Sequence, residues 1–193
     1  MRRTILATVL VISSAPGTAF AQMPHEHHQA RETCSDLTLT CVSPAFGPDG
    51  SLWVAARVNN QIFVAKSFDH GQSFTPPVVI TPDGTTLDGG PDASPKILVD
   101  RSGRVIVAYA TFRDKKFNGE LFYTNSIDGG KTFMPPQPMT ADPESQRFIA
   151  MAIDRDGSIF SAWLDKRNRA AAKEKGETYP GAGLHLPGLT ITE

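Results

Sequence analysis

Eight charged residues in turn-rich segments are the first candidates for chemistry. They come from five polar stretches, at 57–61, 82–94, 112–119, 142–147 and 165–183. Loops on a rigid scaffold commonly carry binding residues, and arginine guanidinium groups can grip a carboxylate with two parallel hydrogen bonds. The alternative for each residue is an ordinary solvated loop. The candidates for ligand binding are Arg57, Asp88, Asp92, Arg113, Asp114, Arg147, Asp165 and Arg167.

Histidines and cysteines near the N-terminus form a second group. His25, His27 and His28 are close enough in sequence to bind a divalent metal, although a flexible polar tail is the simpler interpretation. In an oxidising compartment Cys34 and Cys41 are expected to form a disulfide, the alternative being two free thiols. Their spacing matches no zinc pattern, and no cofactor is expected.

The first 21 residues have the features of a signal peptide. Arg2 and Arg3 precede an apolar stretch at 4–14, and Ala19-Phe20-Ala21 has the form of a signal-peptidase site. The alternative is a buried N-terminal helix. We expect an exported protein, periplasmic or secreted, with no membrane span after signal cleavage. The predicted organisation is a signal peptide at 1–21, a flexible histidine-containing segment at 22–40 and one domain at 41–193.

Composition favours strands and excludes a strongly basic nucleic-acid binder. Lys and Arg total 19 against 20 Asp and Glu, and the chain has 16 glycines and 15 prolines. Apolar runs rich in β-branched and aromatic residues recur between Gly/Pro/Asp turns. Only the segment 168–176 has a helical pattern, and a charged loop is the preferred interpretation of it. Strands are predicted at 42–46, 51–58, 62–67, 78–81, 95–100, 104–111, 120–126, 137–140, 148–154 and 158–164, with a further one near 183–186.

These strands belong to repeats. Three Asp/Gly turns end at Gly50, Gly103 and Gly157, which are 103 − 50 = 53 and 157 − 103 = 54 residues apart, and an apolar strand follows each. A period of this length with four strands per repeat is typical of a β-propeller blade. The sequence therefore predicts an all-β fold of antiparallel four-stranded blades.

A sharper motif, S-x-D-x-G-x-[ST]-F, occurs in the first two repeats and is followed by Pro-Pro each time. It resembles the Asp box, or BNR repeat, of sialidase-like β-propellers, and the resemblance covers about 41–164. In this motif the aspartate accepts hydrogen bonds from the turn, the glycine takes a positive φ, and the phenylalanine is expected to be buried in the blade. The motif residues, with a structural role, are Ser67, Asp69, Gly71 and Phe74, and Ser126, Asp128, Gly130 and Phe133.

The resemblance implies a partial propeller, an N-terminal fragment with about two and a half blades of a six-bladed fold. The third repeat is expected to lack its outer strands, which would leave Phe148, Phe160 and Trp163 incompletely covered. A premature stop or frameshift is one explanation of an incomplete ring. The other is that two or more chains assemble into a closed ring, since open sheet edges invite pairing.

Sialidases hold the substrate carboxylate with three arginines and use a tyrosine nucleophile. This chain lacks the F/Y-R-I-P motif of that family, and its tyrosines, Tyr109, Tyr123 and Tyr179, match no catalytic position. We therefore expect a truncated exported propeller with a binding or assembly role and no independent catalysis. The alternative is an exo-α-sialidase-type glycoside hydrolase acting on sialylated or related glycans. The expected partner is a glycan or another protein chain that completes the propeller, and no nucleic acid.

Overall fold

The first repeat folds into a four-stranded antiparallel sheet, which we call sheet 1. The computed structural model describes residues 41–90, 92–178, 183–185 and 188–189. Strands β1 (Cys41–Phe46), β2 (Leu52–Val58), β3 (Gln61–Ser67) and β4 (Val78–Val79) pair in chain order. The predicted signal peptide, the three histidines and Cys34 lie outside the described residues.

The second repeat forms sheet 2 with the same topology. Its strands are β5 (Lys96–Val99), β6 (Val105–Phe112), β7 (Gly119–Ser126) and β8 (Gln137–Pro138). All residues of β6 except Phe112 are buried, because this strand has a neighbouring sheet on each side. Each predicted strand of the first two repeats is confirmed, although β4 and β8 are shorter than expected.

The third repeat forms a sheet with two long and two short strands. Sheet 3 contains β9 (Gln146–Ile153), β10 (Ile159–Asp165), β11 (Gly183–His185) and β12 (Gly188–Leu189). Strands β11 and β12 pair with different parts of β10, and β11 confirms the strand predicted near 183–186. Among the described residues no further strand pairs with β11 or β12. Trp163 is buried and Phe148 is half-buried, whereas Phe160 is 53% exposed.

A helix replaces the charged loop expected at 168–176. Helix α1 (Arg167–Glu174) lies between β10 and β11, and Ala172 is its buried residue. The run of alanine, arginine, lysine and glutamate has high helix propensity, which outweighs the absence of a side-chain N-cap. Gly176, with a φ of 72°, ends the helix in a left-handed turn. The described residues contain no helix long and apolar enough to cross a membrane.

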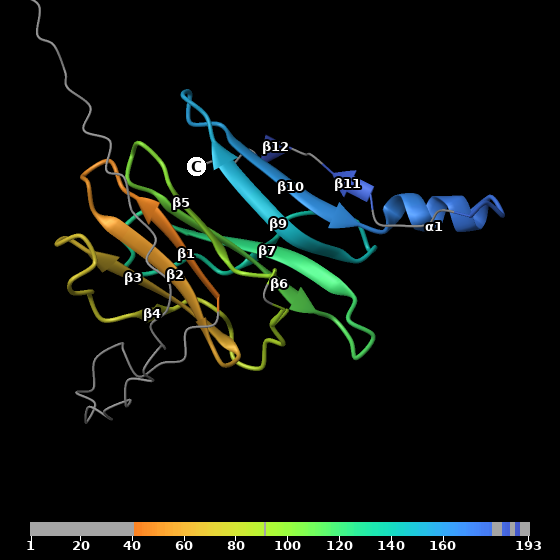
Figure 1. Ribbon diagram of the computed structural model, residues 1–193, viewed down its shortest axis with the longest axis horizontal. Helices are drawn as coiled ribbons and strands as arrows, with labels where there is room; N and C mark the ends of the chain where they lie inside the picture. Colours follow the sequence, from red (N-terminus) through yellow and green to blue (C-terminus); the bar gives the residue numbers. More distant parts are fainter. Residues whose placement is uncertain (1–40, 91, 179–182, 186–187, 190–193) are drawn as a thin grey trace, which may run out of the picture. The chain divides into compact units, whose positions relative to one another are not determined.

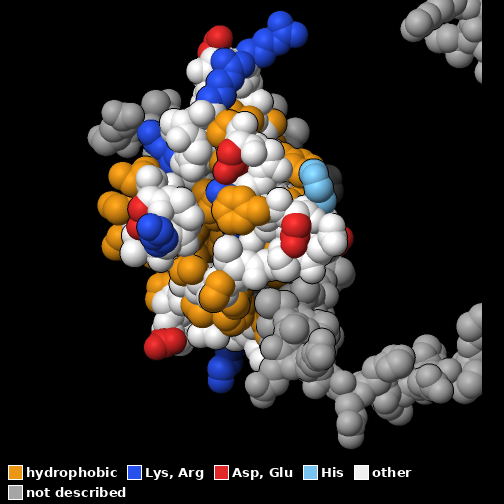
Figure 2. Space-filling model, turned by 90° about the vertical axis from the view of Figure 1, so that its left-hand side faces the viewer, with side chains coloured by type: hydrophobic (Ala, Val, Ile, Leu, Met, Phe, Trp, Pro, Cys, Tyr) orange, Lys and Arg blue, Asp and Glu red, His pale blue; other side chains and the backbone are white. Residues whose placement is uncertain are grey.

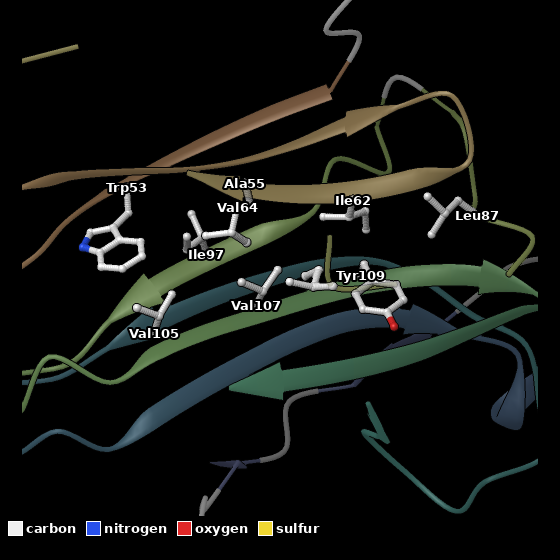
Figure 3. Packing of buried hydrophobic residues seen from close by; sticks show 10 residues of the cluster. Trp53, Ala55, Ile62, Val64, Leu87, Ile97, Val105, Val107 and Tyr109 are labelled. Carbon is white, nitrogen blue, oxygen red and sulfur yellow. The ribbon is translucent and has the colours of Figure 1, made fainter. Parts of the chain in front are cut away.

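The three sheets pack face to face in chain order (Figure 1). Between sheets 1 and 2, Trp53, Ile62 and Val64 point toward Val105, Val107 and Tyr109, as Figure 3 shows. Between sheets 2 and 3, a smaller cluster joins Ala108, Ala110 and Leu121 to Ile149 and Trp163. Successive antiparallel four-stranded sheets stacked in this way are the blades of a partial β-propeller, as the sequence predicted. They belong to one compact unit, Leu37–Glu193.

Corresponding turns of the repeats have the same pattern of internal hydrogen bonds. Gly50, Gly103 and Gly157 each donate a backbone N–H to the carbonyl three residues earlier. In the two motif turns the aspartate accepts the N–H four residues later, from Ser73 at 2.9 Å and from Thr132 at 3.0 Å. The repeats therefore correspond in backbone detail as well as in sequence.

Both motif turns lie at one end of the sheets. The Asp69 turn follows Ser67, which pairs with Leu52 at the start of β2. Gly130 of the Asp128 turn lies against the ring of Trp53, the residue after Leu52, so both turns lie near the start of β2. Phe133 packs against the core between sheets 1 and 2. The expected burial of Phe74 was wrong, because Phe74 is 37% exposed and sheet 1 has no preceding sheet among the described residues.

Candidate functional site

At the opposite end of the sheets, three of the eight predicted loop residues come together around an ion pair between Arg147 and Asp88. Nε of Arg147 donates to one carboxylate oxygen of Asp88 at 2.6 Å, and Nη2 donates to the other at 3.0 Å. Asp88 is buried and also accepts the N–H of Gly90 at 3.2 Å. The two side chains come from the loop before β5 and from the start of β9, so the pair joins the loops of different sheets.

Local pairing places Asp88 at this end. Leu87 forms a bridge with Thr111 near the end of β6, and the N–H of Asp88 donates to the carbonyl of Ala110 at 3.0 Å. The segment 87–88 thus continues the ladder of sheet 2 for two residues. This pairing holds the Asp88 carboxylate at a defined position although it belongs to a long connection.

A β-bulge orients Arg147. The register between β9 and β10 shifts where Ala162 pairs with Ala150 but Leu164 pairs with Arg147. Phe148, inside this shift, has a φ of 60°, a strained backbone conformation for an aromatic residue. Its ring lies 4.6 Å from the guanidinium carbon of Arg147. Bulges commonly redirect a side chain next to a functional site, and this one presents Arg147 to Asp88.

Arg57, at the end of β2, lies beside the same loop. Its Nε donates to the carbonyl of Asn59 at 2.7 Å, and its Nη1 is buried without a hydrogen-bond partner among the described residues. A Cβ at Gly89 would lie 2.5 Å from that Nη1, so the guanidinium packs closely on Gly89 and would have to shift to admit a side chain there. Arg57 therefore has one unused donor close to the Arg147–Asp88 pair.

Cys41 lies under this loop at the start of β1. Its thiol is buried, forms no disulfide among the described residues and donates to the carbonyl of Gly90 at 3.7 Å. The predicted disulfide partner, Cys34, lies outside the described residues, so the disulfide stays a prediction.

A second ion-pair cluster surrounds Arg167, at the junction of β10 and α1. Nε of Arg167 lies 2.6 Å from the buried carboxylate of Asp165 and 3.5 Å from that of Asp142. Nη2 of Arg167 is buried without a partner in the described part of the chain. Sequence reasoning included 142 in a candidate loop but missed Asp142 as an ion-pair partner, since nothing local links it to Arg167.

The loop between β6 and β7 carries Arg113 and Asp114 and forms an open cavity. Asp114 accepts hydrogen bonds from the backbone N–H groups of Lys116 and Asn118. The hydrogen bond from the Asn118 side chain, at 2.7 Å, is the largest cause that lowers the pKa of Asp114. Asp114 therefore stays ionised and shapes the loop, while Nη2 of Arg113 donates to the carbonyl of Glu144 at 3.1 Å.

This loop presents an aromatic side chain that sequence reasoning missed. Phe117 has a φ of 60°, is 64% exposed and meets the ring of Phe112 edge-on, with the centroids 5.2 Å apart. The signal was an aromatic residue within an otherwise polar loop. The cavity beside it measures about 430 Å³, and a second one of about 300 Å³ shares Thr86 and Phe112 with it. The first cavity is lined by Thr86, Phe112, Arg113, Asp114, Lys115 and Phe117.

Of the eight candidates, Arg57, Asp88 and Arg147 come together, as do Asp165 and Arg167, and Arg113 and Asp114 line the cavity. Asp92 is exposed and joins none of these groups through a hydrogen bond in the described residues. No group of three or more metal-ligating side chains occurs in the described part of the chain. The arrangement pairs each of the two buried carboxylates, Asp88 and Asp165, with an arginine.

Tyr109, Asp69 and Asp128 also have shifted pKa values. Tyr109 lines the second cavity but is almost fully buried, and this burial raises its pKa to about 12, so it stays protonated at neutral pH. Asp69 and Asp128 have lowered pKa values, each mainly because the hydroxyl four residues later donates to the carboxylate. These aspartates hold their turns closed. Tyr179 lies outside the described residues.

Comparison with solved structures identifies proteins of similar fold. A protein of unknown function from Dyadobacter fermentans matches 76% of this chain with a TM-score of 0.52 at 16% identity. A mutant α-L-arabinofuranosidase from Fusarium graminearum, in complex with an iminosugar inhibitor, matches 72% with a TM-score of 0.51 at 14% identity. An endo-arabinase from Bacteroides thetaiotaomicron matches 79% at 11% identity, with a TM-score of 0.49.

This chain covers 36% and 44% of the length of the first two proteins. No family model matches the sequence, and no curated protein matches it. At these identities the likeness concerns the fold alone. The chain thus has a partial β-propeller fold of the kind that glycoside hydrolases also use.

Proposed function

We propose that this chain is an exported propeller segment that binds a glycan at its loop end and has no catalytic activity of its own. The observation that carries the proposal is the open cavity of about 430 Å³ beside the exposed ring of Phe117. Ligand sites are typically concave, with aromatic walls and a few polar groups that fix orientation. Here Phe112 and Phe117 offer the apolar surface, while Arg113 and Lys115 offer donors.

A glycan suits this lining better than a purely apolar ligand. Sugar rings present both C–H surfaces, which pack on aromatic faces, and hydroxyl groups, which need hydrogen-bond partners. Asp114 accepts hydrogen bonds, and its ionised state follows from its lowered pKa.

We propose that the chain has no catalytic activity because two arginines of its loop end already form ion pairs with aspartates. Arg147 makes two hydrogen bonds with Asp88, and Arg167 is bonded to Asp165. An arginine bonded in this way must break its ion pair before it can hold a substrate carboxylate. Tyr109 is buried and fully protonated, which makes it unsuitable as a nucleophile.

The second candidate function is an exo-α-sialidase-type glycoside hydrolase acting on sialylated or related glycans. Its support is specific: Nη1 of Arg57 and Nη2 of Arg167 are buried donors without partners among the described residues. Buried unused donors beside carboxylates are a feature of sites that await a ligand. We also propose that the turns at Asp69 and Asp128 are Asp boxes, supported by their matching hydrogen bonds.

Glycan binding can be tested by titrating the purified protein with a panel of sialylated and arabinose-containing oligosaccharides in a calorimeter. Phe117→Ala should weaken binding about tenfold or more, which corresponds to about 1.4 kcal/mol. Phe68→Ala is the matched control, because Phe68 is 72% exposed, against 64% for Phe117, but belongs to the Asp69 turn at the other end. Equal affinity of the Phe117 variant and the native chain, or no binding to any member of the panel, would refute the proposed site.

Catalysis can be tested with a fluorogenic α-sialoside and a fluorogenic α-L-arabinofuranoside. The proposal expects no hydrolysis above a buffer control. Robust turnover that disappears in Arg113→Ala would establish the hydrolase instead. Export can be tested separately, by N-terminal sequencing of the protein recovered outside the cytoplasm, where a start at Gln22 is expected.

A further inference from the structure

Each sheet uses its two faces differently. We call the side that contacts the next sheet along the chain the leading face, and the side that contacts the previous sheet the trailing face. The leading face of sheet 1, with Trp53 and Ala55, is buried against the trailing face of sheet 2, with Val105 and Val107. The leading face of sheet 2 is buried in the same way against sheet 3.

The leading face of sheet 3 is apolar and has no partner among the described residues. Side chains alternate along β10, so Phe160, Ala162 and Leu164 lie opposite the buried Ile159, Ser161 and Trp163. Phe160 is 53% exposed and Leu164 is also exposed. Ala152 pairs with Phe160 and Ala150 pairs with Ala162, and both alanines are exposed. This face carries the apolar residues of an inter-sheet contact without the next sheet.

The trailing face of sheet 1 is the counterpart. Val42 and Phe46 of β1 are exposed, Phe46 to 66%, while Leu52 and Val54 of β2 are half-buried. The pairs Val42–Ala56, Pro44–Val54 and Phe46–Leu52 place these side chains on one side of the sheet. Hydrophobic side chains gather on the side of the molecule drawn in Figure 2, where sheet 1 lies in Figure 1.

One internal contact shows how such faces fit. Trp53 is the third residue after Gly50, and its ring lies on Gly130 in the motif turn of sheet 2. The contact is so close that a Cβ at Gly130 would be 2.5 Å from a ring carbon. In the repeat, Phe160 is the third residue after Gly157 and Gly71 corresponds to Gly130. A Cβ at Gly71 would meet nothing closer than 3.4 Å. The aromatic residue and the glycine of this contact are thus both present and unpaired, at opposite ends of the described chain.

We propose that two copies of this chain form a ring, in which the leading face of sheet 3 of each copy packs on the trailing face of sheet 1 of the other. Phe160 would then lie on the partner's Gly71 and beside the partner's Phe74, as Trp53 lies on Gly130. The proposal rests on the fold and is independent of the proposed glycan binding. Its occupant is a second copy because the two open faces complement each other by repeat position.

The number of sheets favours a ring of two chains over a ring of three. The described residues of each copy form three sheets, so two copies supply six, within the range of about four to eight in which propellers close. Three copies would supply nine, which exceeds this range. A two-fold ring also satisfies both open faces of each copy, whereas an unclosed head-to-tail contact would propagate into a polymer.

The test measures the mass of the mature protein by sedimentation velocity and light scattering over a range of micromolar concentrations. The native chain should be a dimer. Phe160→Asp and Phe46→Asp should each raise the dissociation constant at least about tenfold. Both side chains are exposed in the single chain, so circular dichroism and Tm should change little. Ile127→Asp is the control, because Ile127 is highly exposed at the Asp128 turn and belongs to neither face.

Mixing the two variants makes the test specific. A heterodimer of Phe160→Asp with Phe46→Asp contains one interface with both charges and one fully native interface. Mixing should therefore restore part of the dimer that neither variant forms alone. A monomeric native chain, a trimer or longer polymer, or a Phe160→Asp variant that remains fully dimeric would each overturn the proposal.

Discussion

Gly130→Ala tests the central packing relation of this fold, the contact between one sheet and the motif turn of the next. Gly130 has a φ of 81°, and a Cβ would lie 2.5 Å and 2.7 Å from two ring carbons of Trp53. That ring is buried between sheets 1 and 2 and cannot move aside without disturbing the core (Figure 3). Gly129→Ala is a matched control, because Gly129 has a φ of 75° and open space around it.

The two substitutions share one cost and differ in another. A left-handed backbone conformation costs a residue with a Cβ about 1–2 kcal/mol, at Gly129 as at Gly130. Overpacking against a buried ring adds about 1–3 kcal/mol at Gly130 only. Gly129→Ala should thus lower the free energy of unfolding by about 1–2 kcal/mol, and Gly130→Ala by about 2–5 kcal/mol. For a domain of this size each kcal/mol lowers Tm by about 2–4 °C.

The assay is urea unfolding followed by circular dichroism, with each substitution made in the native chain and in Trp53→Leu. The smaller leucine should remove most of the difference between Gly130→Ala and Gly129→Ala, because the clash loses its partner. Equal destabilisation by both alanines in the native chain would refute the contact. A difference that persists unchanged in Trp53→Leu would assign it to another neighbour.

Three further outcomes are expected. Arg147→Met leaves the buried Asp88 carboxylate without its ion pair. Since Arg147 is 29% exposed, the free energy of unfolding should fall by about 3 kcal/mol, the lower end of the range for buried pairs. Urea unfolding measures this, and a decrease under about 0.5 kcal/mol would contradict the expectation. Asp69 has its pKa lowered to about 2, mainly by the Ser73 hydroxyl, so its stabilisation is complete above the unfolded value of about 4 and is lost as pH falls toward 2. Asp69→Asn should therefore flatten the acid limb of a Tm-against-pH profile, and an unchanged limb would count against this role. Hydrogen exchange should be slowest in β6, which is covered on both faces, and faster in β10; the reverse order would contradict the packing described here.

Much of the fold could be predicted from sequence because its signals are local. Alternating apolar residues predicted the strands, and the spacing of Gly50, Gly103 and Gly157 predicted three repeats of one unit. The helix at Arg167–Glu174 was not the preferred interpretation because the segment contains many charged residues beside its alanine run. Ala172 is its buried residue, and this packing is not visible in the sequence. Strand β11 was predicted near 183–186, whereas β12 was missed because its two residues are too few to show a periodic pattern.

The candidate site was predictable only in outline. Up-and-down connectivity places the loops with Arg57, Asp88, Arg113 and Arg147 at one end, and this follows from strand order alone. The pairing of Arg147 with Asp88 does not, since the two are 59 residues apart and either could have remained solvated. A β-bulge at Phe148 decides it, by turning Arg147 toward a carboxylate that pairing with β6 holds in place.

Sequence by itself thus determined the repeat, the strands and the turns, because each depends on side-chain alternation or on hydrogen bonds within a few residues. Only the tertiary structure decided which charges meet, which aromatic ring is buried and which is presented to solvent. Phe133 and Phe74 occupy the same motif position, yet Phe133 packs against a preceding sheet and Phe74 has none to pack against. Burial depends on neighbours that are distant along the chain, and no local pattern encodes them.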